Sequence, residues 1–306
     1  MDIHLRPRAG YNGFGRCEMS EFSRFHPMST AVYFALVIFI SAFSFDPIIA
    51  LSSLLGSALF CIFICNEKGR FKSFLFYLLI AVLIAVTNPL FSHNGKTPLF
   101  FIADKPYTLE ALVYGSVLSL TIVSVMLWCK AFSKIFSSDK LLCLIGGIAP
   151  RLSTVISAAL RYIPLFMRRA GTVSRAQRAI GAYSSNSIKS RIKAHLNMFS
   201  ALAGWSLENA AETANSMKAR GYGAAKRTSY SDFKFRLRDL ALLIICVALS
   251  TLVILSFQSC SFYPEIRLPS IGNALPFYIC FFILSMIPFI IETEATFRWI
   301  YCRSKI

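Results

Sequence analysis

Six stretches of 18 to 22 residues contain no Asp, Glu, Lys or Arg, and they constrain the fold more than any other feature of the chain. A helix needs roughly 20 apolar residues to cross the hydrocarbon core of a bilayer, so each stretch has the length of a transmembrane helix. The sequence therefore predicts an all-α membrane protein with about six transmembrane helices. The stretches are 28–45, 48–65, 73–91, 111–129, 240–258 and 270–291.

The net charge of +17 is concentrated in one segment, 130–238, which holds 19 Lys and Arg against four acidic residues. Because the excess belongs to one module between apolar stretches, we do not expect nucleic acid as a partner. The predicted organisation is a cytoplasmic N-terminal segment (1–27), helices one to four (28–129), a cytoplasmic module with two long helices (130–236), helices five and six (237–291) and a cytoplasmic tail (292–306).

Orientation follows from the distribution of Lys and Arg, since short loops rich in these residues stay in the cytoplasm. The first 27 residues contain four Arg, and the loop after the second stretch contains Lys68, Arg70 and Lys72. The loops 92–110 and 259–269 are nearly neutral and are expected to lie outside. With six spans, this alternation places both termini and the basic module in the cytoplasm.

The module predicts two long helices, over 151 to about 180 and 190 to about 219. In the first, Arg161, Arg168 and Arg175 recur every seven residues and share one stripe of the helix. The second is rich in Ala, Ser and Gly, which permit close approach of another helix, so we expect the two to cross. The arginine stripe is equally compatible with a solvated face beside anionic lipid headgroups.

Residue patterns for catalysis are missing. The chain has no G-x-x-x-x-G-K-[ST] phosphate loop, and its four histidines lack the spacing of metal ligands. The six stretches carry no charged side chain of the kind that marks proton or ion pathways. We therefore expect no catalytic, cofactor or metal site in this chain.

The end of the second long helix is the sharpest positive feature, because the predicted helix runs into Ala219-Arg220-Gly221-Tyr222-Gly223. Glycine readily takes the left-handed conformation that closes helices, so Arg220 is presented at an exposed helix end. There it can make paired hydrogen bonds to carboxylates of another protein. The alternative is that Arg220 only caps its own helix.

Four sequence segments together resemble the T component of energy-coupling factor transporters, and the resemblance extends from about residue 26 to 227. It includes the step Arg161-Tyr162-Ile163-Pro164 and the module start Ser138-Asp139-Lys140. The four segments are Asn88-Pro89-Leu90-Phe91-Ser92-His93-Asn94-Gly95, Thr108-Leu109-Glu110-Ala111, Trp205-Ser206-Leu207-Glu208-Asn209-Ala210 and Ser216-Met217-Lys218-Ala219-Arg220-Gly221-Tyr222-Gly223.

The resemblance implies a non-catalytic coupling subunit in the cytoplasmic membrane of a bacterium or archaeon. Its implied partners are two ABC-type ATPase subunits, which hold ATP and Mg, a small membrane-embedded S component that binds the substrate, and membrane lipid. The implied function is uptake of a vitamin or other micronutrient. A membrane-embedded lipid-modifying enzyme and a self-sufficient carrier remain alternatives.

The resemblance also implies two coupling helices, each ending in an Ala-Arg-Gly-like motif that docks on one ATPase. The first motif has isoleucine at the arginine position, so either Arg178 reaches the ATPase carboxylates from one turn away or a more apolar groove accepts Ile180. The implied ATPase-coupling residues are Ala219, Arg220, Gly221, Arg178, Ala179, Ile180, Gly181 and Arg175.

Overall fold

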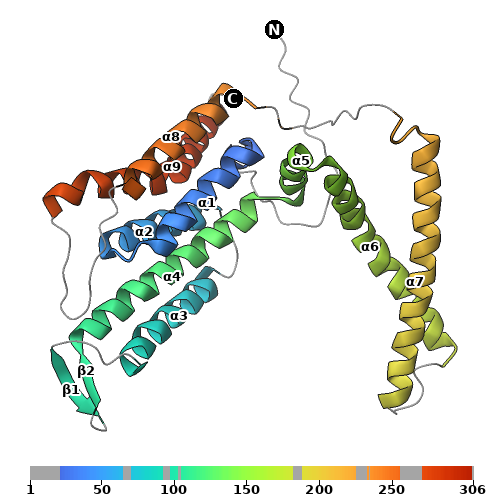
Figure 1. The fold of residues 1–306 in the computed structure, drawn as a ribbon, viewed down its shortest axis with the longest axis horizontal. Helices are drawn as coiled ribbons and strands as arrows, with labels where there is room; N and C mark the ends of the chain where they lie inside the picture. Colours follow the sequence, from blue (N-terminus) through green and yellow to red (C-terminus); the bar gives the residue numbers. More distant parts are fainter. Residues whose placement is uncertain are drawn as a thin grey trace. The chain divides into compact units, whose positions relative to one another are not determined.

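The chain divides into two compact units in a computed structural model (Figure 1). A membrane unit combines Met1–Ser138 with Phe233–Ile306, and a second unit, the module, comprises Asp139–Asp232. The structure describes residues 21–64, 70–91, 97–102, 105–181, 188–224, 233, 235–255 and 271–304.

The membrane unit is built from long apolar helices. Among the described residues, five helices have the length and composition to cross a membrane, and α1, with 17 residues, is apolar but shorter. The prediction of an all-α membrane protein is confirmed, and the described residues hold five such helices and the shorter α1 where about six were predicted. The elements are the 3-10 helix η1 (Glu21–Arg24), α1 (Pro27–Phe43), α2 (Pro47–Ile64), α3 (Arg70–Phe91), α4 (Leu109–Ile135), α8 (Leu237–Leu255) and α9 (Ile271–Ser304).

Helices α4 and α9 extend well beyond their uncharged stretches. Helix α4 continues to Ile135, so Lys130 and Lys134, which the sequence analysis assigned to the module, lie on α4. Helix α9 continues to Ser304, so most of the segment 292–306 is helical rather than a separate tail. Charge limits only the part of a helix inside hydrocarbon, and these helices extend beyond that part.

A short β-hairpin precedes α4, in the region expected to be a loop. Strands β1 (Pro98–Ile102) and β2 (Lys105–Thr108) pair antiparallel. Thr108 then caps α4, because its hydroxyl accepts a hydrogen bond from the Ala111 N–H. The Glu110 carboxylate accepts a 2.8 Å hydrogen bond from the Thr97 hydroxyl and ties the hairpin to the helix.

Aromatic side chains form the core of the membrane unit, with ring centroids 5.3 to 6.4 Å apart. The polar atoms of this cluster are satisfied, since the Tyr33 hydroxyl donates to the carbonyl of Leu284 on α9 and the Trp128 indole N–H donates to Ser53 on α2. The first bond joins α1 to α9, and the second joins α4 to α2. The cluster comprises Phe22, Tyr33, Phe34, Phe60 and Trp128.

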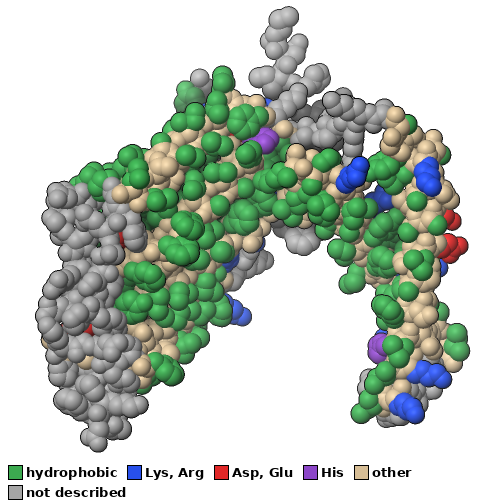
Figure 2. Space-filling model, in the orientation of Figure 1, with side chains coloured by type: hydrophobic (Ala, Val, Ile, Leu, Met, Phe, Trp, Pro, Cys, Tyr) green, Lys and Arg blue, Asp and Glu red, His purple; other side chains and the backbone are tan. Residues whose placement is uncertain are grey.

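The outer surface of the same unit is apolar, and Figure 2 shows hydrophobic side chains over its visible face. Helix α3 is the extreme case, because Phe74, Leu79 and Leu83 are each more than 60% exposed. A soluble protein rarely exposes such a continuous apolar surface. Lipid tails are the solvent that this surface requires.

The module consists of α5 (Ser138–Ile148), α6 (Pro150–Ala179) and α7 (Ile188–Ala219). The hydroxyl of Ser153 on α6 donates to the Leu142 carbonyl on α5, which fixes the sharp turn between these helices. Helices α6 and α7 run antiparallel and cross, as the sequence analysis predicted (Figure 1). Little of their surface is buried. Among the described side chains, only Ala194 is buried in α7 and none is buried in α6.

Lys140, at the start of α5, is expected to make the stability of the protein depend on pH. The side chain is buried, no hydrogen-bond partner for its amine occurs among the described residues, and this burial lowers the pKa from 10.5 to about 8. Between these pKa values the unfolded chain binds more protons than the folded protein, so the free energy of unfolding rises with pH. The total gain is at most about 3 kcal/mol.

We therefore expect the thermal denaturation midpoint of the protein in detergent to rise between pH 8 and pH 10. In Lys140→Met the midpoint should be higher at pH 7, and the component of the pH dependence due to Lys140 should disappear. Equal pH dependence in the two proteins would contradict the buried, unpaired amine.

Candidate functional site

Helix α7 ends in a backbone turn closed by glycine. The Tyr222 N–H donates to the Met217 carbonyl at 3.0 Å, and the Gly221 N–H donates to the Lys218 carbonyl at 2.9 Å. Gly221 has a φ of +78°, a left-handed conformation that costs other residues free energy. This pair of hydrogen bonds is a Schellman motif, and it leaves the Arg220 side chain exposed at the helix end.

Helix α6 also ends at a glycine with positive φ, and one of the two hydrogen bonds seen at the end of α7 recurs there. Gly181 has a φ of +79°, and its N–H donates to the Arg178 carbonyl at 3.0 Å. Ile180 precedes this glycine as Arg220 precedes its own, so the two side chains occupy equivalent positions. The Ile180 side chain is 84% exposed. Both helix ends are therefore closed by a glycine with positive φ. They differ in the exposed residue before that glycine, which is isoleucine at the end of α6 and arginine at the end of α7.

The two ends are far apart within the module. In the antiparallel register, Tyr162 of α6 faces Thr213 of α7 and Gln177 faces Ala194. Ala219, the last residue of α7, thus lies beside a part of α6 about 25 residues before Ala179, the last residue of α6. At about 1.5 Å per residue, the two helix ends are roughly 35–40 Å apart along the helix axis. The structure brings together the residues of each end, but it keeps the two ends separate.

Basic side chains surround both ends. Arg178 lies in the last turn of α6 and Lys218 in the last turn of α7, where cations interact favourably with the partial negative charge of a helix C-terminus. Arg175 lies one turn earlier, and its Nε donates to the Gly171 carbonyl at 3.3 Å, so this side chain follows its own helix. Each end is suited to contact an acidic surface.

Aromatic and hydroxyl contacts join α6 to α7 between the two ends. The hydroxyls of Tyr162 and Thr213 share a 2.8 Å hydrogen bond, which is the main reason that the pKa of Tyr162 lies below its ordinary value. The Phe166 and Trp205 rings meet edge to face at 5.4 Å, and the Arg169 guanidinium lies 5.7 Å from the Trp205 ring centroid. These contacts hold the crossing of the two helices.

Gln177 adds a polar contact near the end of α6. With its amide oriented so that both atoms are paired, Gln177 donates to the Ala194 carbonyl and accepts from the Met198 N–H, each at 3.1 Å. Ala194 is the buried residue among the described side chains of α7, and its small methyl side chain permits this approach. The contact links the first helix end directly to α7.

Sequence reasoning assigned no role to Trp205, Gln177 or Tyr222. Trp205 and Tyr222 belong to the segments that carry the family resemblance, and a large aromatic side chain among small residues was a usable signal. Gln177 gives no such signal, because its role depends on which turn of α7 it meets. Tyr222 is 52% exposed beside Arg220 and enlarges the surface of that helix end.

Among the described residues no group of three or more His, Cys, Asp or Glu side chains could hold a metal ion. The features described above are two exposed helix ends and the crossing between them. Such an arrangement can bind other proteins and transmit displacement along stiff helices.

Sequence comparison relates most of the chain to transport proteins. The sequence model of the CbiQ family, described as cobalt transport protein, matches residues 21–230. The energy-coupling factor transporter transmembrane protein EcfT of Staphylococcus aureus is 35% identical over 105 residues, and that of Bacillus subtilis is 31% identical over 104. The corresponding protein of Listeria innocua is 26% identical over 225 residues.

The extent of these matches differs. The Staphylococcus match covers 34% of this chain and the Bacillus match 33%, and each covers 39% of the relative, so it spans about two fifths of that protein's length. The Listeria match covers 63% of this chain and 85% of the relative.

Proposed function

The chain belongs to the CbiQ family, whose members include transmembrane components of energy-coupling factor transporters, and on that premise we propose that it couples two cytoplasmic ATPases to a membrane-embedded S component. ATP and Mg bind to the ATPase subunits. The S component binds the substrate, a vitamin or other micronutrient, which the complex imports across the cytoplasmic membrane of a bacterium or archaeon.

The observation that carries this proposal is the pair of glycine-closed helix ends, which expose Arg220 and Ile180 about the length of a helix apart. Two equivalent but separate ends fit two ATPase subunits better than one binding site. The second end offers a guanidinium that can pair with carboxylates. The first end offers an apolar side chain flanked by Arg178, so we propose that it docks in a more apolar groove.

Force transmission is proposed to pass through the crossing of α6 and α7. Closure of the ATPase pair would displace one helix end relative to the other, and the contacts of Tyr162, Phe166 and Trp205 would pass the displacement between the helices. Such contacts resist sliding because aromatic side chains pack to a defined geometry. This chain then works as a lever and contributes no reacting group.

The S component is proposed to pack on apolar surface. Association inside lipid depends on close packing rather than on exclusion of water. Leu152 and Val155 of α6 and Leu196 and Phe199 of α7 are each more than half exposed and could meet another apolar protein. The positive-inside rule supports a cytoplasmic position for the module and for both termini.

Affinity purification of the tagged chain from its native membranes tests the proposal. We expect two ATPase subunits and one small apolar protein to copurify, and ATP hydrolysis to occur in the complex but not in the chain alone. The chain purified alone and reconstituted in liposomes should transport nothing. Solute transport by the isolated chain would establish the carrier alternative, and an altered lipid product would establish the enzyme alternative.

A further inference from the structure

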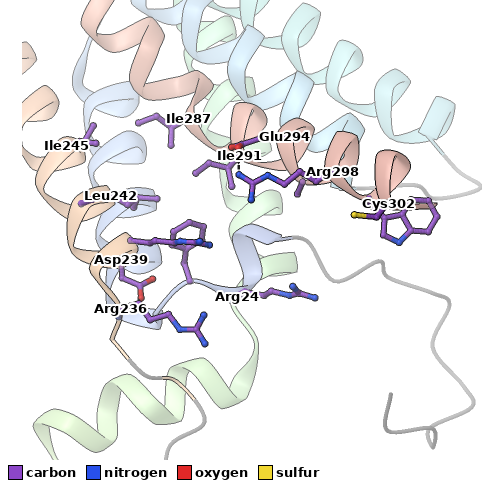
Figure 3. A pocket seen from close by; sticks show the side chains of 15 residues that line it. Arg24, Arg236, Asp239, Leu242, Ile245, Ile287, Ile291, Glu294, Arg298 and Cys302 are labelled. Atoms are coloured by element: carbon purple, nitrogen blue, oxygen red, sulfur yellow. Dashed lines mark hydrogen bonds and ion pairs between the residues drawn. The ribbon is translucent and has the colours of Figure 1, made fainter. Parts of the chain in front are cut away.

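A cavity of about 910 Å³ opens in the membrane unit where α8 begins and α9 leaves its apolar segment. The described residues that line it all belong to this unit and come from η1, the η1–α1 connection, α9 and the start of α8. The site lies outside the module and plays no part in the coupling described above. Its walls combine guanidinium groups with aliphatic side chains (Figure 3).

Among the described residues that line the cavity there are four arginines, Arg24, Arg236, Arg238 and Arg298, and two acidic residues. The acids are committed to partners within the protein. Asp239 is buried, and its oxygens accept hydrogen bonds from the His26 and Arg236 backbone N–H groups at 2.9 and 2.8 Å, which fixes the start of α8. Glu294 pairs with Arg298 on the same face of α9. The described lining therefore retains a net positive charge.

The other part of the cavity is aliphatic. On α8 the lining changes from Arg238 to Leu242 and Ile245, and on α9 it changes from Arg298 to Ile291 and Ile287. Both helices thus run from basic to apolar in the same direction, over about 10 Å on α8 and about 16 Å on α9. Figure 3 shows this order, with Arg24 and Arg236 on one side of Leu242 and with Ile245 and Ile287 on the other.

This gradient matches the profile of a bilayer. Helix α9 has 34 residues and is about 51 Å long, whereas hydrocarbon is about 30 Å thick, so its charged last turns lie at headgroup level. Trp299, which is 58% exposed at this level, is a residue type enriched at membrane interfaces. With α9 placed in this way, the arginines would lie at the depth of the lipid phosphates, and Ile245 and Ile287 at the depth where acyl chains begin.

We propose that this cavity binds one anionic phospholipid. The guanidinium groups of Arg236 and Arg238 contact the phosphate and headgroup, and one acyl chain lies against Ile245 and Ile287. The positive charge of the cavity alone would suit any soluble anion, but a small anion has no apolar surface that could contact the aliphatic wall. An acidic protein segment would need an apolar side chain that reaches hydrocarbon depth beside its charged residues. A phospholipid already combines a charged headgroup with acyl chains in this arrangement.

The site has a structural consequence. Arg236 and Arg238 begin α8, immediately after the module ends at Asp232. A lipid held there would immobilise the point at which the chain enters the membrane again. It would also join α8 to α9 through a ligand that the bilayer supplies.

Native mass spectrometry of the full chain in detergent tests the proposal, with phosphatidylglycerol and phosphatidylcholine of identical acyl chains as probes. We expect one phosphatidylglycerol to be retained in preference to phosphatidylcholine. In the double variant Arg236→Gln/Arg238→Gln the preference should fall about 30-fold, since each basic residue contributes roughly a factor of five near an anionic lipid. Ile245→Gln should weaken retention of both lipids and leave the preference intact.

A matched control, Lys130→Gln/Lys134→Gln, removes the same charge from the end of α4 and should keep the wild-type preference. Thermal denaturation of each variant checks that it is folded. Because Arg236 and Arg238 are exposed, replacing them should not change the fold. The proposal is overturned if wild type retains both lipids equally, if the arginine variant keeps its preference, or if inorganic phosphate at millimolar concentration displaces phosphatidylglycerol. Loss of copurifying proteins from that variant with unchanged lipid preference would identify a protein contact instead.

Discussion

Arg220→Glu is expected to abolish copurification of the ATPase subunits and to reduce their affinity by more than about 100-fold, or about 3 kcal/mol. This expectation rests on the proposed function. A guanidinium buried against carboxylates in a complex leaves them unpaired when it is removed, and a glutamate adds repulsion. The measurement is ATPase binding to the purified chain in nanodiscs, at low and at high salt.

The fold should not change in Arg220→Glu. The Arg220 side chain is exposed, and the hydrogen bonds that close α7 join backbone atoms of Tyr222, Gly221, Met217 and Lys218. The thermal denaturation midpoint should therefore remain within a degree or two of wild type.

Two control variants separate position from charge. Lys218→Glu makes the same charge change two residues earlier in the last turn, and we expect it to weaken ATPase binding less than tenfold. Arg220→Lys keeps the charge but loses the planar pair of donors, so binding should fall to an intermediate value. If Arg220→Glu bound the ATPases as wild type does, the second helix end would not be the docking point.

The membrane helices were predictable from sequence because a charged side chain is costly within hydrocarbon, so an uncharged stretch has a direct physical cause. Helix ends at Gly181 and Gly221 were predictable for a similar reason, since glycine takes positive φ at little cost. In each case the determining interaction is local in sequence or involves only the solvent.

The remaining features depend on which distant segments meet. The β-hairpin at 98–108 forms beside α4 and is anchored by Glu110, which looked like a loop acid in the sequence. Gln177 contacts α7 because of a register that no local pattern encodes. The arginine-lined cavity requires the start of α8 to lie beside the end of α9, and the sequence separates these by more than 50 residues. The sequence fails where long-range packing selects among locally equivalent alternatives.

Small residues also determine how closely α2 and α9 pack. A methyl group placed on Gly56 of α2 would lie 2.8 Å from the Ser285 Cβ and 2.9 Å from the Ser285 carbonyl oxygen of α9. The Ser285 hydroxyl donates to Phe282 at 2.9 Å and lies 3.4 Å from the Ser52 carbonyl, so its position is held from both helices. Because a backbone oxygen is one of the close atoms, a side-chain rotation cannot relieve the contact.

Gly56→Ala should therefore lower the free energy of unfolding of the membrane unit by about 1–3 kcal/mol. Gly56→Leu should prevent recovery of monodisperse protein. The measurement is the temperature at which half of the detergent-purified chain leaves the monodisperse peak in size-exclusion chromatography. Gly171→Ala and Gly204→Ala are matched controls, because their added methyl groups would meet nothing within 4 Å and alanine favours helix. We expect both controls to melt at or above the wild-type temperature. A Gly56→Ala protein that melted with them would show that α2 and α9 do not pack at this distance.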